Sequence, residues 1–206
     1  MPHPLRIGIL GAAPIAVAAI IDPCRRLPDV LPYAVAARDP ARATSYATRH
    51  AIPIVHANYA NLLADLMVDA VYIPLPNSLH AEWAARALQA GKHVLCEKPL
   101  VANAQEAAAL AQVAHKSGGT AGEMHVVMPF LPHHFNLVTV YGRGGKRLFR
   151  VAGDTTYTYQ LRAFAEAARG GAIPPTDVHD AVLNMRLIDS VYRAAGLEVR
   201  SALLAT

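Results

Sequence analysis

The chain has 206 residues, which is enough for one domain with a sizeable hydrophobic core and a small second unit. Because 53% of the residues are hydrophobic and only 17% are charged, the composition excludes an intrinsically disordered chain. The net charge of +4 comes from scattered Arg and Lys without interleaved aromatic residues, so we expect an anionic small ligand, not nucleic acid.

The two cysteines, Cys24 and Cys96, lack the spacing of a metal site or a redox pair, which favours reduced thiols and a cytoplasmic protein. The apolar run at 7–21 resembles a signal peptide, but glycines and a proline interrupt it and it is too short to span a membrane. A strand, a turn and a buried helix explain the same residues. We therefore expect neither a leader nor a membrane segment.

The first predicted strand is a compact apolar run at 5–10, typical of a central parallel strand. The next six residues, 11–16, stand where a dinucleotide-binding fold has its Gly-x-Gly-x-x-Gly turn. Ala13 and Ala16 replace the second and third glycines, which weakens the motif but does not abolish it. Backbone amides at such a turn bind phosphate, so the candidate cofactor contacts are Gly11, Ala13, Pro14 and Ile15. The alternative is an ordinary strand-to-helix turn.

The second predicted strand, 33–37, ends in Arg38-Asp39-Pro40. In a dinucleotide fold this strand end meets the adenosine ribose, where an acidic residue selects NAD and an arginine accommodates the 2′-phosphate of NADP. Arg38 therefore favours NADP, and Arg42 is one helical turn further along and placed to assist. In the alternative interpretation Arg38 is a solvated cation that Asp39 neutralises.

Strands and helices continue to alternate after this point. We predict strands at 52–55 and 69–73 and a helix at 58–65. Asn77 or Ser78 is expected to cap a further helix. In that helix apolar residues recur at helical spacing, which places Trp83 in the core and not on a stacking surface.

A helix stop at Gly91 and a buried strand at 92–96 lead into Glu97-Lys98-Pro99. Since ligands of open α/β sheets bind at the carboxyl ends of the strands, Glu97 and Lys98 are delivered to that edge on a turn stiffened by Pro99. An ammonium beside a carbonyl polarises it during hydride transfer and exchanges a proton with a hydroxyl. The alternative is a surface ion pair of little energetic value.

With this motif and the turn at 11–16, the sequence resembles the Gfo/Idh/MocA family of NAD(P)-dependent oxidoreductases, and within it the branch of dihydrodiol and aldose dehydrogenases. The resemblance runs from 5 to about 117 and resumes from about 118 to 197. It implies a Rossmann-type, doubly wound parallel α/β domain at 1–118. A truncated α+β antiparallel-sheet domain would follow at 119–206, with a large internal part missing.

The resemblance also implies roles for single residues. Lys98 is expected to be the catalytic acid/base group, with Glu97 as its partner. Both are also expected to contact the cofactor, Glu97 through the ribose. Leu75 and Asn77 are expected beside the nicotinamide and its ribose. His80 either contacts the cofactor or substrate, or lies exposed on the helix surface.

The rest of the chain begins with a predicted helix at 101–116, capped by Asn103 and Glu106 in a capping-box pattern. Residues 119–123 are interpreted as a Gly-x-x-Gly turn of the second domain. Short strands are predicted at 126–131, 137–141 and 146–151, and a helix at 157–169. A last helix, capped by Thr176 or Asp177, is expected to face the core with Val178, Val182, Met185, Leu187, Ile188, Val191 and Tyr192.

The family's proton-relay motifs do not occur in this sequence, and His133-His134 lack a third ligand at metal spacing, so no metal site is expected. We therefore carry two main hypotheses. The first is an oxidoreductase that uses NADP (or NAD) on a sugar, polyol or dihydrodiol. The second is a nucleotide-binding pseudoenzyme without turnover. A third is the product of a decayed gene whose open sheet edge pairs with other chains. A homodimer through the apolar sheet face is expected.

Overall fold

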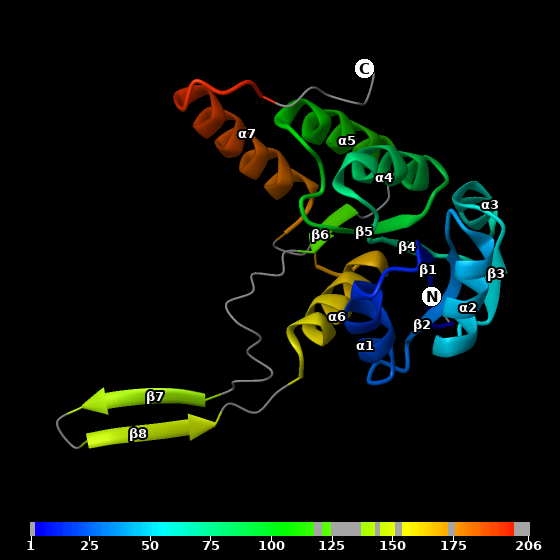
Figure 1. Cartoon of the computed structure of the whole chain (residues 1–206), viewed down its shortest axis with the longest axis horizontal. Coiled ribbons are helices and arrows are strands. Elements are labelled where there is room, and N and C mark those ends of the chain that lie inside the picture. The colour runs from blue at the N-terminus through cyan, green and yellow to red at the C-terminus, as the bar shows by residue number, and fades with distance from the viewer. Residues whose placement is uncertain are drawn as a thin grey trace.

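The computed structural model describes residues 3–117, 121–124, 137–142, 145–150, 154–172 and 176–199. Its main body is a six-stranded parallel sheet of order β3-β2-β1-β4-β5-β6 with helices on both faces (Figure 1). The chain winds outward from β1 to β3 and then continues from β4 on the other side of β1, which places the topological switch point between β1 and β4. The predicted Rossmann-type, doubly wound fold is confirmed.

The strands lie close to the predicted ranges, and most differences are at their ends. Those of the parallel sheet are β1 (Leu5–Leu10), β2 (Val30–Ala36), β3 (Ile54–His56), β4 (Ala70–Ile73), β5 (His93–Glu97) and β6 (Ala121–Met124). A separate antiparallel pair consists of β7 (Leu137–Gly142) and β8 (Gly145–Arg150). β2 begins three residues before the predicted start at 33, because its pairing with β1 extends through Pro32. The predicted strand at 126–131 lies outside the described residues.

The helices follow the strands in the expected alternation. They are the π-helix η1 (Val17–Ile21), α1 (Asp22–Cys24), α2 (Pro40–His50), α3 (Tyr59–Ala64), the 3-10 helix η2 (Asn77–Leu79), α4 (His80–Gln89), α5 (Ala104–Ser117), α6 (Thr156–Ala168) and α7 (Val178–Ala194). Within the described ranges, none of them is both long and apolar enough to cross a membrane.

Helix caps test the local predictions directly. Asn103 Oδ1 accepts the Glu106 amide at 2.9 Å, so the predicted Asn103 cap is confirmed, while Glu106 Oε2 accepts the amide of Ala102, one residue before the cap, at 2.9 Å. Asp177 caps α7, as one of the two predicted alternatives. The prediction that Asn77 or Ser78 caps the helix after β4 is wrong. η2 precedes α4 there, and neither helix start has a side-chain cap.

The sheet extends further along the chain than the sequence indicated. Residues Ala121–Met124 pair in parallel with β5, from Val94 opposite Ala121 to Glu97 opposite Met124. The interpretation of 119–123 as a turn of a second domain is therefore wrong from residue 121 onward. The helix α5 between β5 and β6 forms the usual crossover between parallel strands, and the extended run after it continues the sheet.

The two last helices pack against the same body. α6 lies beside η1 and α1 on one face of the sheet, and α7 lies along α5 on the other (Figure 1). On α6 the predicted stripe is buried, with Leu161, Phe164 and Ala168 at 0%, 3% and 6% exposure. Helices on both sides of residue 118 thus share one core, and the division into domains at 118 stays a prediction.

α7 buries a narrower face than predicted. Val178 and Met185 are buried, but Leu187, Ile188 and Val191 are 64%, 43% and 58% exposed, so the prediction that these three face the core is wrong. Only part of the apolar surface of α7 packs against α5. Helical periodicity identifies an apolar stripe but does not show how much of it another element covers.

The shared core predicts how a substitution in α6 affects the rest of the fold. Replacing Phe164 by Ala should lower the free energy of unfolding by about 3–5 kcal/mol, because a large buried ring is removed. We expect a single urea transition, shifted to lower urea, in the fluorescence of Trp83, the one tryptophan of the chain. The matched control Glu166→Ala changes an exposed side chain on the same helix and should leave the transition in place. An unshifted Trp83 transition in Phe164→Ala would contradict the shared core.

Candidate functional site

A cleft of about 780 Å³ lies at the carboxyl ends of β1, β2, β3 and β4. Four short segments form most of its wall, namely 11–13, 37–39, 58–60 and 74–76. Each segment follows a different strand of the parallel sheet, and the cleft straddles the switch point between β1 and β4. Open α/β sheets bind their ligands at this position.

The turn after β1 requires glycine at its first residue. Gly11 has φ +114°, and a Cβ there would lie 3.1 Å from Leu75 Cδ2. Gly11 N donates to Ala36 O at 2.7 Å, and Ala13 N donates to Gly11 O at 2.9 Å. Gly11 and Ala13 line the cleft, whereas Pro14 lines a separate cavity against α2. Pro14 begins the first helical turn, since its carbonyl accepts the Val17 amide at 3.1 Å.

Two side chains of α2 hold this turn in place. Arg42 Nη2 donates to Ala12 O at 3.0 Å, and the Tyr46 hydroxyl donates to Ala13 O at 3.1 Å. Burial raises the pKa of Tyr46 to about 12, so its hydroxyl stays a donor at neutral pH. Arg42 was predicted only to assist Arg38, and Tyr46 was not identified from the sequence. Their spacing of four residues on one helix was the available signal.

Two arginines face the cleft from the end of β2 and the start of α2. Arg38 is exposed and forms no ion pair within the described part of the chain. Asp39 instead caps α2 by accepting the Ala41 amide at 2.9 Å. The alternative in which Asp39 neutralises Arg38 therefore does not describe this structure. Guanidinium groups in this setting form bidentate hydrogen bonds with phosphates.

An aromatic pair lines the cleft opposite the turn. The rings of Tyr59 and Trp83 meet edge to face with centroids 5.0 Å apart, and the Arg86 guanidinium lies 4.8 Å from the centre of the Trp83 ring. Trp83 packs against the core, as predicted, but it is only half-buried and also lines the cleft. Tyr59 and its neighbour Asn58 were not predicted as site residues, although both follow a strand that ends at this edge.

Glu97 ends β5 beside a buried tyrosine. Tyr72, fully buried on β4, donates its hydroxyl to Glu97 Oε1 at 2.6 Å. Burial, and then the Glu97 charge, raise the pKa of Tyr72 above its ordinary range, and the same two causes raise the pKa of Tyr157 on α6. Glu97 is therefore a carboxylate oriented by a neutral phenol. Neither tyrosine was identified from the sequence.

Lys98 follows Glu97 and is exposed. Among the described residues no ion pair joins it to Glu97, so the predicted alternative of a surface ion pair between the two is not what this structure contains. The peptide bond from Lys98 to Pro99 is cis. Lys98 thus presents an ammonium group at the carboxyl edge of the sheet that has no ion-pair partner in the described ranges.

His80 is fully buried, which contradicts the alternative of an exposed helix residue. Its Nε2 lies 2.6 Å from Leu75 O and its Nδ1 lies 2.7 Å from Pro99 O. Both ring nitrogens are therefore engaged by backbone carbonyls, and the ring connects the loop after β4 with the turn after β5. Burial of this histidine needs the tertiary fold and left no signal in the sequence.

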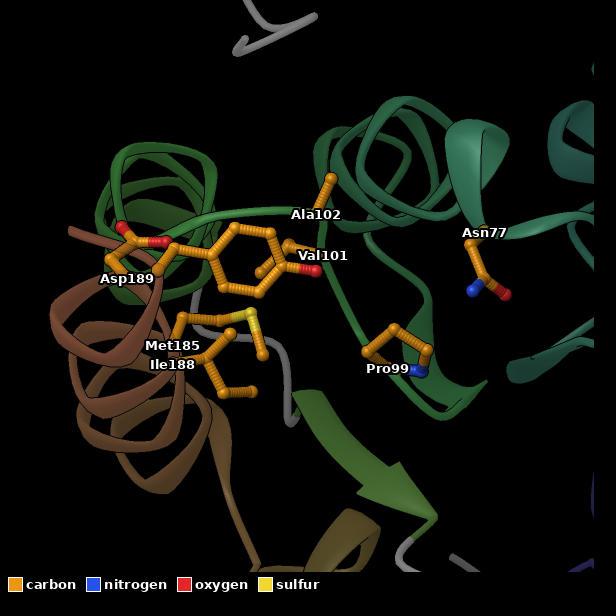
Figure 2. Close-up of a pocket in the computed structure, with 8 residues that line it drawn as sticks. Asn77, Pro99, Val101, Ala102, Met185, Ile188 and Asp189 are labelled. Atoms are coloured by element: carbon orange, nitrogen blue, oxygen red, sulfur yellow. The ribbon is translucent and has the colours of Figure 1, made fainter. Parts of the chain in front are cut away.

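A second cavity, of about 200 Å³, adjoins this turn; we call it the α7 cavity. In Figure 2, Met185 and Ile188 extend from α7 toward Pro99, while Val101 and Ala102 lie on the connecting segment and Asn77 on the far side. Asp189 and Tyr192 complete its lining. The loop after β4 therefore serves two cavities, with Leu75 in the cleft and Asn77 in the α7 cavity.

The predicted site residues are thus distributed around one edge of the sheet. Gly11, Ala13, Arg38 and Leu75 share the cleft, whereas Glu97 and Lys98 end the neighbouring strand without lining either cavity. Within the described residues, no group of three His, Cys, Asp or Glu side chains is arranged to hold a metal ion. The edge combines a glycine turn, two guanidinium groups, a carboxylate and an ammonium.

Comparison with known proteins identifies similar chains. The profile of an oxidoreductase family with an NAD-binding Rossmann fold, Gfo/Idh/MocA, matches residues 5–125. Over 119 residues the chain is 46% identical to D-xylose 1-dehydrogenase (NADP(+)) 2 of Haloferax volcanii, which covers 58% of this chain and 36% of that protein. Over 210 residues it is 42% identical to a dTDP-3,4-didehydro-2,6-dideoxy-alpha-D-glucose 3-reductase of Streptomyces violaceoruber, covering 95% of this chain and 58% of that protein.

Among solved structures, a 3-ketoreductase from Actinomadura kijaniata in complex with NADP and TDP-benzene is 38% identical, with a TM-score of 0.58. That match covers 65% of this chain and 40% of the other. The chain therefore spans about a third to three fifths of the length of these relatives.

The bridge made by His80 generates a prediction about the whole edge. His80→Ala should lower the free energy of unfolding by about 2–4 kcal/mol, because it opens a cavity and leaves buried carbonyls without a donor. Urea denaturation followed by circular dichroism measures the change. The control Ser78→Ala alters an exposed side chain on the same loop and should have no effect. Equal stability of both variants would show that the bridge does not hold the two segments.

Proposed function

The chain belongs to the Gfo/Idh/MocA oxidoreductase family, whose NAD(P)-binding Rossmann domain it carries, and from this membership we propose its function. The protein is an NADP-preferring oxidoreductase that interconverts a hydroxyl and a carbonyl of a sugar, polyol or dihydrodiol. The observation that carries the proposal is the cleft at the switch point, which combines the Gly11 turn with Arg38. The names of the relatives support it, since they are sugar dehydrogenases and sugar ketoreductases.

The residues of the cleft fit a phosphorylated dinucleotide. Gly11 has φ +114°, a conformation that favours glycine, and without a side chain there a pyrophosphate can approach the backbone of the turn. Arg38 and Arg42 would bind the 2′-phosphate, and Tyr59 and Trp83 would lie against the adenine. When bound, the nicotinamide supplies or accepts the hydride.

The groups at the end of β5 would handle the proton. Lys98 would donate a proton to the substrate carbonyl oxygen in reduction, or take it from the hydroxyl in oxidation. Glu97, oriented by Tyr72, would hold the ribose hydroxyls. His80 would act as a positioning residue, because its ring joins the cleft wall to the Lys98–Pro99 turn.

The quaternary state and location complete the proposal. Leu183, Leu187 and Val191 form an exposed apolar stripe on α7 at a spacing of four residues. We propose that a second copy of the chain covers it. We also propose a cytoplasmic location. Residues 119–206 would form a second unit that is shorter than the corresponding domain of the family.

Cofactor binding is tested with the fluorescence of Trp83. NADPH should quench its emission saturably, by energy transfer to the reduced nicotinamide. Arg38→Ala should weaken NADPH about tenfold to a hundredfold, because charge-assisted hydrogen bonds to the phosphate are lost, and should leave NADH affinity unchanged. Arg49→Ala removes the same charge from α2, outside the cleft, and serves as the control. No quenching by either dinucleotide would overturn the proposed function.

Turnover is tested separately with D-xylose, a keto sugar and a trans-dihydrodiol. Lys98→Ala should reduce kcat about a hundredfold to ten-thousandfold through loss of general acid/base catalysis, while NADPH affinity is retained. Lys116→Ala, an exposed lysine at the far end of α5, is the control. NADPH binding without turnover of any substrate by the unaltered protein would instead select the nucleotide-binding pseudoenzyme.

A further inference from the structure

The lining of the α7 cavity differs from that of the neighbouring cleft, which contains Arg38 and Arg42. Its apolar part consists of Pro99, Val101, Ala102, Met185 and Ile188. Its polar groups are the Asn77 amide, the Tyr192 hydroxyl and the Asp189 carboxylate, and the described lining includes no lysine or arginine. The net charge of the lining is therefore negative.

Asp189 is the most informative of these groups. Asp189 is only 5% exposed. Its Oδ2 accepts a hydrogen bond of 3.0 Å from the backbone amide of Ala104, the first residue of α5. Within the described part of the chain, Oδ1 has no hydrogen-bond partner. Since Asp189 lines the cavity, this oxygen is available as an acceptor, and a ligand hydroxyl that donates to it gains a charge-assisted hydrogen bond.

We propose that the α7 cavity binds the ring of a neutral vicinal diol, such as a free sugar or a cyclic dihydrodiol, and excludes sugars carried on a nucleotide diphosphate. The ring hydroxyls donate to Asp189 and Asn77, and the apolar face of the ring packs on Met185 and Ile188. This inference rests on the proposed function and specifies the substrate class of the same edge.

Size and charge both discriminate between the two classes. A cavity of about 200 Å³ is below the usual range of about 300–1,000 Å³ for larger ligands, so it suits a single ring. A diphosphate needs cationic partners when it leaves water, and the described lining offers a carboxylate instead. The relatives include both classes, a D-xylose dehydrogenase and dTDP-sugar reductases, so likeness alone does not choose between them.

The position of the cavity joins it to the cleft. Asn77 lies two residues after Leu75 on the loop shared by both cavities, and Pro99 directly follows Lys98. A ring seated against Met185 therefore lies beside the turn that carries the proposed acid/base group. Helix α7, from the second half of the chain, supplies the wall that selects the substrate.

The test uses the methyl group of Met185 as a reporter. The full-length protein is labelled with ¹³C-methyl methionine, the Met185 signal is assigned with Met185→Leu, and D-xylose, trans-cyclohexane-1,2-diol and dTDP-glucose are titrated in the presence of NADP. D-xylose and the cyclohexanediol should shift the Met185 signal saturably. dTDP-glucose should leave it unchanged.

Two variants locate the effect. Ile188→Phe fills the cavity and should weaken both neutral ligands about tenfold or more, whereas Leu197→Phe places the same ring on an exposed residue beyond the end of α7 and should not. Asp189→Asn keeps an acceptor for the Ala104 amide and removes the charge, so it should weaken the diols about tenfold. Unaltered circular dichroism in each variant excludes loss of fold as the cause.

Opposite results overturn the inference without ambiguity. A saturable shift with dTDP-glucose but not with the diols assigns the cavity to a nucleotide sugar. No shift with any probe, in protein whose Trp83 is quenched by NADPH, shows that the α7 cavity binds no substrate while the proposed cofactor function stands. Absence of NADPH quenching, by contrast, overturns the proposed function. The two failures are distinguishable because quenching is measured at Trp83 in the cleft and substrate binding at Met185 in the α7 cavity.

Discussion

Parallel pairing of all six strands is the constraint on which the site depends. Because every strand of the sheet runs the same way, the segments that follow β1, β2, β3 and β4 emerge at one edge. The glycine turn at 11–13, Arg38, Tyr59 and Leu75 are far apart in the sequence, yet they line one cleft for this reason. An antiparallel neighbour would have sent one of these segments to the opposite edge and left the cleft incomplete.

Buried polar side chains then fix the loops that the sheet only brings together. His80 connects the loop after β4 with the turn after β5, Tyr72 orients Glu97, and Arg42 and Tyr46 hold the turn after β1. Each of these contacts satisfies a backbone carbonyl or a carboxylate near the edge. A loop held in this way loses little further entropy when a ligand binds, which is the physical meaning of preorganisation.

The second half of the chain contributes both to the hydrophobic core and to the cavity beside Lys98. α6 covers one face of the sheet and α7 packs on α5 at the other, so both contribute to the core. α7 also supplies Met185, Ile188 and Asp189 to the cavity beside Lys98. The chain spans only 58% of the sugar reductase that it matches over 95% of its own length, and α7 forms one wall of the cavity of about 200 Å³.

Local patterns in the sequence were sufficient to determine the alternation of strands and helices, the glycine turn, the Asn103 cap of α5 and the strand-end position of Glu97 and Lys98. Each depends on residues within one or two turns of each other, where periodicity and capping chemistry act directly. Only the tertiary structure decided that His80 is buried, that Trp83 borders the cleft, that Ala121–Met124 join the sheet, and that Leu187 and Val191 stay exposed. Those outcomes depend on which element covers which face, and a hydrophobic pattern records that a face is apolar without recording its neighbour.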